Sequence, residues 1–370
     1  MELAWFSRFF RILRRQNWWM TLAMCALAVV SVLFIYSSCW VSDDQPIKDE
    51  YQKQAGWAAL GLVSYLVMAV YDYHRLARLS WWGYWVTLFL LVLVLVAGPV
   101  INEARRWLIV GPMMLQPSEL GKMATLLLLA HLMSQPNADV KTFRGFLKLS
   151  TLAVVPFILV LKEPDLGTSL VFVPMTFLMM LAGGVSGRIL GTLVVVGLLA
   201  AGGVLAGVVL PEKLPIRPET RARMEELIPL TNYQKERILT FVDADHDPMG
   251  AGWNKRQSMI AIGSGGLWGK GFNQGTQNIL GFLPRKVAPS DFIFAVVAEE
   301  SGFMGSLGLL TLYSILVIGG MRTATAAKDR FGRLLCVGII AVLFTHVFVN
   351  MAMTVGILPI TGLPLPLMSY

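Results

Sequence analysis

Asp291 is the residue with the clearest capacity for chemistry, because it opens a long apolar stretch typical of a membrane-spanning helix. A carboxylate in hydrocarbon costs about 3 kcal/mol on insertion scales, so a chain keeps one mainly where it faces a protein interior or a wet cavity. A helix running on from Asp291 would place Asp291, Ala295 and Glu299 on one face, at a spacing of four residues. This stripe predicts a polar site, and the alternative is that Asp291 only caps the helix.

A second polar cluster lies between residues 105 and 122. Arg106 and Trp107 precede Ser118, which is a suitable helix cap, and Glu119 and Lys122 follow three residues apart. Side chains at this spacing share a helix face. They are candidates for a functional site, with a structural ion pair at a helix end as the alternative.

The glycine-rich stretch of residues 262–271 is not a nucleotide-binding loop. Ser264 stands where such a loop has its first glycine, and Gly271 stands where it has a serine or threonine. Clustered backbone N–H groups could still form an anion-binding nest for a lipid-linked phosphate. A flexible glycine loop is the alternative.

Composition sets the class of protein. Hydrophobic residues make up 55% of the chain, charged residues only 15%, and the mean hydropathy is +0.62; soluble proteins carry about 25% charged residues. Stretches of about 20 apolar residues, each long enough to cross a bilayer, recur along the chain. The sequence therefore predicts an all-α polytopic integral membrane protein, with spans at Trp18–Trp40, Ala55–Tyr71, Trp81–Val100, Ser118–Met133, Leu149–Leu161, Thr168–Gly183, Ile189–Leu210, Ile293–Met321 and Leu334–Thr354.

Basic residues predict the orientation. With a cytoplasmic N-terminus, the inner segments carry fourteen lysines and arginines and the short outer loops carry five, which is the bias expected of membrane proteins. A long outer loop, about residues 211–290, then precedes the eighth span, and its length indicates a functional role. Its basic surface suits an anionic partner or anionic lipid headgroups.

Cysteines and histidines indicate no redox or zinc chemistry. The three cysteines make no disulfide framework, and the four histidines lack the spacing of metal ligands.

Several sequence blocks together resemble the SEDS family (shape, elongation, division and sporulation). They occur in family order from about residue 100 to the last residue, and they are Ala104–Trp107, Gln116–Glu119, Pro164–Ser169, Gln257–Leu267, Gly269–Gly271, Gly275–Gln277, Asp291–Val296, Ala298–Glu300 and Gly362–Pro366. The Gly275–Gln277 block is more similar to RodA, the cell-elongation member, than to FtsW, the division member.

The resemblance implies a single transmembrane domain over residues 1–370. The family has about ten transmembrane helices, of which nine are visible here, so the last helix is expected beyond residue 370. The implied activity is polymerisation of lipid II into peptidoglycan strands at the outer face of the bacterial cytoplasmic membrane. The implied partners are a class B penicillin-binding protein and other proteins of the elongation complex. No nucleic-acid partner is expected.

The family motifs also assign residues to the site. The family's essential aspartate falls on Asp291, as the catalytic residue. No cofactor is certain, and a divalent cation (Mg²⁺ or Mn²⁺) held by Asp291 is left open. The substrate-binding candidates on the matching motifs are Arg106, Trp107, Glu119, Lys122, Gln257, Ser264, Gly265, Gly266, Lys270 and Glu299.

Glycan transfer fits these residue types. A base must take the proton of the attacking sugar hydroxyl, which suits Asp291, and cations must stabilise the departing diphosphate, which suits Arg106, Lys122 or Lys270. We expect one outward-facing cavity lined by Arg106, Glu119, Lys122 and Asp291. The alternatives are a lipid II flippase, a division-specific polymerase like FtsW, and a non-catalytic scaffold.

Overall fold

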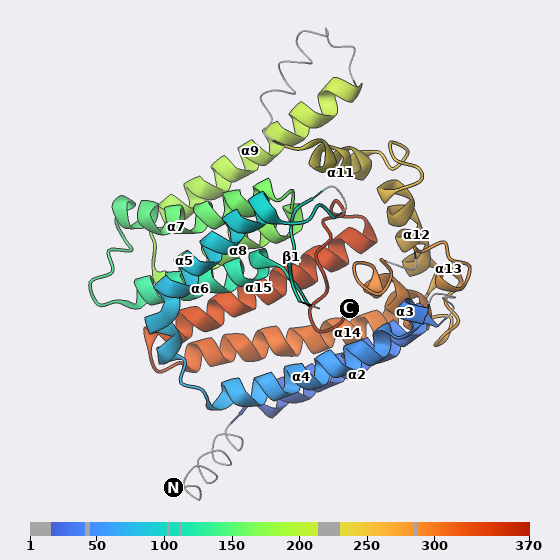
Figure 1. Cartoon of the computed structure of the whole chain (residues 1–370), viewed down its shortest axis with the longest axis horizontal. Helices are drawn as coiled ribbons and strands as arrows, with labels where there is room; N and C mark the ends of the chain where they lie inside the picture. The colour runs from blue at the N-terminus through green and yellow to red at the C-terminus, as the bar shows by residue number, and fades with distance from the viewer. Residues whose placement is uncertain (1–15, 41–44, 102–103, 112, 214–229, 285–286) are drawn as a thin grey trace, which may run out of the picture.

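The protein is a bundle of long helices in the computed structural model, which describes residues 16–40, 45–101, 104–111, 113–213, 230–284 and 287–370 (Figure 1). The long helices are α2 (Trp18–Cys39), α4 (Glu50–Val70), α5 (His74–Ala97), α6 (Pro117–Ser134), α7 (Phe143–Lys162), α8 (Leu166–Gly183), α9 (Gly187–Lys213), α14 (Ile293–Ala326) and α15 (Arg330–Val355). The shorter elements are α3 (Gln45–Lys48), the hairpin β1 (Leu108–Val110) and β2 (Met113–Leu115), α11 (Asn232–Val242), α12 (Ala251–Ser264) and α13 (Thr276–Ile279).

Each predicted span corresponds to one long helix, so the predicted all-α membrane class is confirmed. Eight of these helices are long and apolar enough to cross a membrane by their own composition. The ninth, α6, carries Glu119 and Lys122 in its first turns and is enclosed by α5, α8 and α15. Protein neighbours rather than lipid therefore surround Lys122, which is fully buried, whereas Glu119 stays partly exposed.

The spans end where local signals stop the helix. Asp165 and Asp329 cap α8 and α15 by accepting the N–H groups of the residues three positions on. Gly184 and Gly356 end the same two helices in the left-handed conformation (φ 87° and 86°), which glycine adopts without strain. The fifth span is longer than predicted, because α7 begins at Phe143, behind its Thr142 cap.

Helix α14 is broken at Gly302, whose φ of 67° and ψ of −161° are not helical. Beyond the break, the N–H groups of Phe303 and Met304 donate to the carbonyls of Gly266 and Leu267. The glycine-rich stretch thus supplies the acceptors that the broken helix lacks. Irregular backbone at such a depth is tolerated only where protein neighbours satisfy its polar groups.

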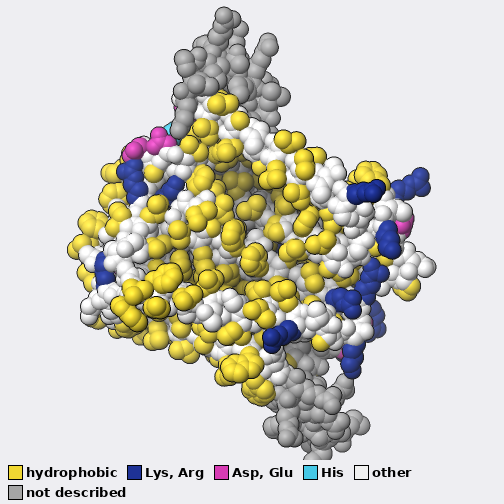
Figure 2. Space-filling model, turned by 180° about the vertical axis from the view of Figure 1, so that it is seen from behind, with side chains coloured by type: hydrophobic (Ala, Val, Ile, Leu, Met, Phe, Trp, Pro, Cys, Tyr) yellow, Lys and Arg dark blue, Asp and Glu magenta, His cyan; other side chains and the backbone are white. Residues whose placement is uncertain are grey.

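The surface shows how the bundle meets a bilayer. A broad hydrophobic band covers the rear face of the molecule, and lysine and arginine side chains gather toward its edges (Figure 2). This distribution is the one expected of helices that cross hydrocarbon and end in water.

The predicted long loop of residues 211–290 begins inside a helix, since α9 continues to Lys213. Its described part contains α11, α12 and α13, which lie together at one end of the bundle (Figure 1). Residues 214–229 and 285–286 of this loop, and the basic N-terminal residues up to Arg15, lie outside the described residues.

Candidate active site

Asp291 lies in the turn just before α14, not within the helix. The helix begins at Ile293 and its N-cap residue is Phe292, with no side-chain cap bond. The predicted helix through Asp291 was therefore wrong by two residues. Asp291 and Glu299 therefore do not share a helical face, and Asp291 does not cap the helix.

The backbone at Asp291 is fixed from two sides. Its N–H donates to the carbonyl of Val287 (3.0 Å), and its carbonyl accepts from Nδ2 of Asn350 in α15 (3.0 Å). The same Asn350 amide donates to the carbonyl of Leu363 (2.8 Å), in the C-terminal segment. Helix α15 thus fixes the position of the Asp291 backbone, from which the side chain extends.

Burial raises the pKa of the Asp291 carboxyl above its ordinary value. The positive charges of Arg237 and Arg106 and a hydrogen bond with Ser290 lower this pKa in the opposite direction. The two arginines therefore lie close enough to act on Asp291. A raised proton affinity makes a carboxylate a stronger base, which suits Asp291 to accept a proton.

Arg106 and Arg237 are held against one aromatic ring. The guanidinium carbon of Arg106 lies 5.6 Å from the ring centroid of Tyr233, and that of Arg237 lies 4.6 Å from it. Arg106 donates to the carbonyls of Glu163 (3.2 Å) and Pro164 (2.5 Å). These bonds join the loop before β1, the α7–α8 turn and α11.

Glu119 and Lys122 form the ion pair that was the structural alternative for this cluster, and their substrate-binding role stays a prediction. Lys122 Nζ donates to Glu119 Oε1 at 2.8 Å, and it also lies 2.7 Å from Nε2 of His346 in α15. Lys122 is fully buried, whereas the Glu119 side chain is about half exposed. Of the two side chains, only that of Glu119 is therefore accessible to solvent or a ligand.

The two parts of the site meet through α15 and the C-terminal segment. His346 and Asn350 are four residues apart on α15, and the consecutive carbonyls of Leu363 and Pro364 bind them. The expected common cavity for Arg106, Glu119, Lys122 and Asp291 stays a prediction.

Trp107 is half-buried and directly precedes β1.

Glu163 is the most isolated polar group near Arg106. Its side chain is fully buried, and neither carboxylate oxygen has a hydrogen-bond partner. Burial, helped by the negative charge of Asp165 and opposed by Arg106, raises the pKa of Glu163 to about 9. Glu163 is therefore uncharged at neutral pH.

The glycine-rich residues contact α14 rather than Asp291 in the described structure. The carbonyl of Gly265 accepts from Gly269, and a Cβ atom on Gly265 would lie 2.0 Å from the carbonyl oxygen of Ala298. Gly266 has a φ of +56°, and Ser264 donates to Ala261 (2.9 Å). Close packing against α14 accounts for these glycines, and their substrate-binding role stays a prediction.

The half-buried Lys270 and the buried Glu299 form a separate pair. Lys270 Nζ lies 2.6 Å from Glu299 Oε1, which also accepts from the backbone of Gln277 (3.0 Å). The Glu299 side chain is 1% exposed. Gln257, in the nearby α12, is also buried. The pair anchors the glycine-rich stretch to α14, and direct contact of these residues with substrate stays a prediction.

The residues around Asp291 do not suit a divalent cation. Such ions take several oxygen ligands, whereas two guanidinium groups are the charged neighbours that act on Asp291. Among the described residues, no group of three or more histidine, cysteine, aspartate or glutamate residues could hold a metal ion.

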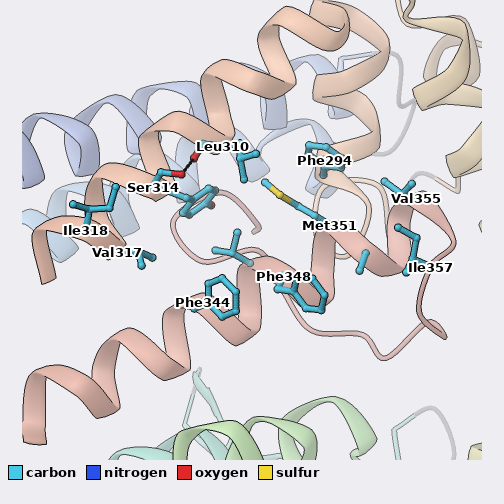
Figure 3. Close-up of a pocket in the computed structure, with 13 residues that line it drawn as sticks. Phe294, Leu310, Ser314, Val317, Ile318, Phe344, Phe348, Met351, Val355 and Ile357 are labelled. Atoms are coloured by element: carbon cyan, nitrogen blue, oxygen red, sulfur yellow. Dashed lines mark hydrogen bonds between the residues drawn. The ribbon is translucent and has the colours of Figure 1, made fainter. Parts of the chain in front are cut away.

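An apolar groove begins just beyond the site. It has a volume of about 410 Å³, lies between α14 and α15, and starts at Phe294, three residues past Asp291 (Figure 3). Phe344, Phe348 and Met351 of α15 face Leu310 and Ile318 of α14 across it. The polar site is thus bordered by a surface suited to hydrocarbon.

Sequence reasoning missed Tyr233, Arg237, His346 and Glu163. Tyr233 lies within the capping box of Thr231 and Gln234, and Arg237 follows four residues later on the same helix, so a helical aromatic–cation pair could have been predicted there. No local signal links His346 to Lys122 or exposes the burial of Glu163, because both depend on how distant helices pack.

Together, the fold and the site define a polytopic α-helical membrane protein with a half-buried carboxylate, on which two arginines act, at one end of the bundle. The chain matches the cell cycle protein family of FtsW, RodA and SpoVE over residues 17–370. The protein belongs to this family, which is the SEDS family that the motifs resemble.

Named relatives cover nearly the whole chain. It is 37% identical over 351 residues to the peptidoglycan glycosyltransferase MrdB of Escherichia coli K12, covering 95% of this chain and 87% of MrdB. It is 31% identical over 407 residues to the peptidoglycan glycosyltransferase RodA of Treponema pallidum, covering 94% of this chain and 92% of RodA.

Solved structures share the fold. One is a chain of a peptidoglycan synthase complex described as coordinating polymerization and crosslinking (TM-score 0.73, 29% identity, 96% of this chain and 92% of that chain). Another is RodA of Thermus thermophilus (TM-score 0.64, 26% identity, 96% and 90%).

Proposed function

We propose that this protein is a peptidoglycan glycosyltransferase that polymerises lipid II at the outer face of the bacterial inner membrane, in cell elongation. The observation that carries the proposal is the half-buried Asp291 carboxylate, on which the charges of Arg106 and Arg237 act. The named activities of MrdB and RodA, to which the chain is similar along nearly its whole length, support the same reaction.

Asp291 acts as the general base in this proposal. It accepts the proton of the acceptor sugar hydroxyl while that oxygen attacks the anomeric carbon of the donor. The bond from the anomeric carbon to the diphosphate breaks, and the bonding electrons leave on the diphosphate oxygen. Arg106 stabilises the negative charge that grows there.

The topology follows from the same proposal. The N-terminus lies in the cytoplasm, residues 1–370 form one transmembrane domain, and the segment with α11, α12 and α13 lies outside the cell.

The class B penicillin-binding protein packs on an apolar helix face. Copurification in mild detergent should recover it, and its consistent absence would count against the elongation role.

Asp291→Asn tests the catalytic role, because it keeps the side-chain size and removes the basicity. Purified protein with its partner should convert lipid II to polymer without ATP, and the variant should lower the rate by about 10²–10⁴-fold. Asp245→Asn is the matched control, since the Asp245 side chain is 78% exposed and pairs with Arg256; it should polymerise like the wild type.

Two results would redirect the proposal. Polymerisation by Asp291→Asn at the wild-type rate would remove Asp291 from catalysis. A variant that polymerises normally but no longer moves lipid II across vesicle membranes would favour the flippase alternative. Complementation of an elongation-defective strain, compared with a division-defective strain, separates the RodA-like role from the FtsW-like role.

A further inference from the structure

Arg106 and Arg237 carry charge that their described hydrogen bonds do not neutralise. Arg106 donates to the carbonyls of Glu163 and Pro164, and Arg237 donates to the carbonyl of Ile360 (2.6 Å) and the hydroxyl of Tyr233. All four acceptors are neutral groups. Each guanidinium has five N–H donors, so these bonds leave donors over on both side chains.

None of the described hydrogen bonds joins either guanidinium group to a carboxylate. Glu163, which is in electrostatic contact with Arg106, is uncharged at neutral pH because its pKa is raised to about 9. Asp165, whose negative charge acts on Glu163, accepts from Gln116 and from the N–H of Thr168 instead. The remaining N–H donors of Arg106 and Arg237 therefore favour an anionic ligand with several acceptor oxygens.

Gly362 borders the space between Asp291 and Arg237, which an anionic ligand would enter. Its φ is +74°, and a Cβ atom built there would find Asp291 Oδ2 at 3.6 Å and Arg237 Nη1 at 3.7 Å as its nearest neighbours. Both groups thus border the space that the missing side chain leaves. A reacting bond placed over Gly362 would lie beside the carboxylate and the guanidinium together.

Helix α11 holds Arg237 in this position. The capping box of Thr231 and Gln234 fixes where the helix starts, and Gln234 also donates to the carbonyl of Leu161 (3.3 Å). Tyr233 and Arg237, four apart, then share a face. An arginine whose fork is fixed in this way loses little freedom on binding a phosphate.

We infer that Arg237, together with Arg106, binds the diphosphate of a prenyl-diphosphate-linked sugar and sets its anomeric carbon–oxygen bond over Gly362, beside Asp291. Guanidinium groups bind phosphate oxygens in bidentate geometry, with stronger hydrogen bonds than neutral donors make. As the bond to the diphosphate breaks, Arg237 meets the charge that develops on the leaving oxygen. This assignment rests on the proposed function and adds to it the group that receives the leaving diphosphate.

Direct binding of geranyl diphosphate and geranyl monophosphate to the purified protein tests this assignment. Arg237→Ala should weaken the affinity for the diphosphate by about 10- to 100-fold, the range for hydrogen bonds to charged groups. Arg237→Lys should recover only part of it and lose most of the preference for diphosphate over monophosphate. Arg256→Ala is the matched control, since Arg256 lies in α12, is 42% exposed and pairs with Asp245; its affinity should equal that of the wild type.

The results separate this inference from the proposed function. Wild-type affinity and diphosphate preference in Arg237→Ala would overturn it, and if that variant fails to fold, the same result in Arg237→Lys would do so. Asp291→Asn should keep the diphosphate affinity. Normal polymerisation by Asp291→Asn, with diphosphate binding lost in Arg237→Ala, would sink the catalytic proposal and leave the diphosphate site standing.

Discussion

Glu163→Gln should change how the stability of this protein depends on pH. The Glu163 carboxyl is fully buried without a hydrogen-bond partner, and its pKa rises from 4.5 to about 9 on folding. Between these two values the folded state holds a proton that the unfolded state has released, so the free energy of unfolding falls as pH rises. Each pKa unit corresponds to about 1.4 kcal/mol, which amounts to about 3 kcal/mol at pH 7 and about 6 kcal/mol above pH 9.

Glutamine has nearly the same shape as glutamic acid and does not titrate. The stability of Glu163→Gln relative to the wild type should therefore rise steadily between about pH 5 and pH 9, by about 5 kcal/mol. Chemical unfolding in detergent at a series of pH values measures this difference. Glu236→Gln, at a side chain that is 58% exposed, should follow the wild-type slope. Parallel profiles for the wild type and Glu163→Gln would refute the reasoning.

Three further substitutions test the buried polar contacts. Lys270→Met leaves the buried Glu299 carboxylate unpaired and should cost about 3–5 kcal/mol of stability, read from the unfolding midpoint; a midpoint equal to that of the wild type would contradict the buried pair. Gly302→Ala forces alanine into a backbone conformation that is essentially restricted to glycine and should cost at least about 1–3 kcal/mol; an unchanged thermal midpoint would mean that the break in α14 is not required. Lys122→Met should lower the rate of lipid II polymerisation per folded molecule. A lower stability with a normal rate per folded molecule would make the Glu119–Lys122 pair purely structural.

The helical framework could be predicted because each span repeats the same local signal. Twenty apolar residues have few structures open to them in a bilayer, and every predicted span corresponds to a helix. Even α6 was predicted despite Glu119 and Lys122, because its remaining residues are apolar enough to mark it. The predicted span starts at Ile293, as α14 does, but the expected extension of the helix back to Asp291 was wrong, because Asn350, which is remote in the sequence, holds a turn there.

Part of the candidate site was predicted from local sequence. Asp291 was found from its place at the start of an apolar span, Arg106 was found in the polar cluster before the fourth span, and the family motifs then assigned a role to both. The structure adds that both act in one electrostatic environment. Arg237 was missed because an arginine in a long polar loop looks like any solvated charge. Its role depends on Tyr233 and on a carbonyl 123 residues away in sequence, which no local pattern contains.

The C-terminal segment shows why an irregular motif can occupy the centre of a membrane bundle. Pro364 and Pro366 have no N–H group, so the segment offers carbonyl acceptors with fewer donors to satisfy. These acceptors are used by distant elements: the carbonyl of Pro364 meets His346 of α15, and that of Pro366 meets the Tyr313 hydroxyl of α14. Earlier in the segment, Ile360 accepts from Arg237 of α11. This proline-rich segment thus fixes three helices relative to Asp291. A substitution that added an N–H donor to the segment or bent its backbone should therefore displace Asp291 and Arg237 together.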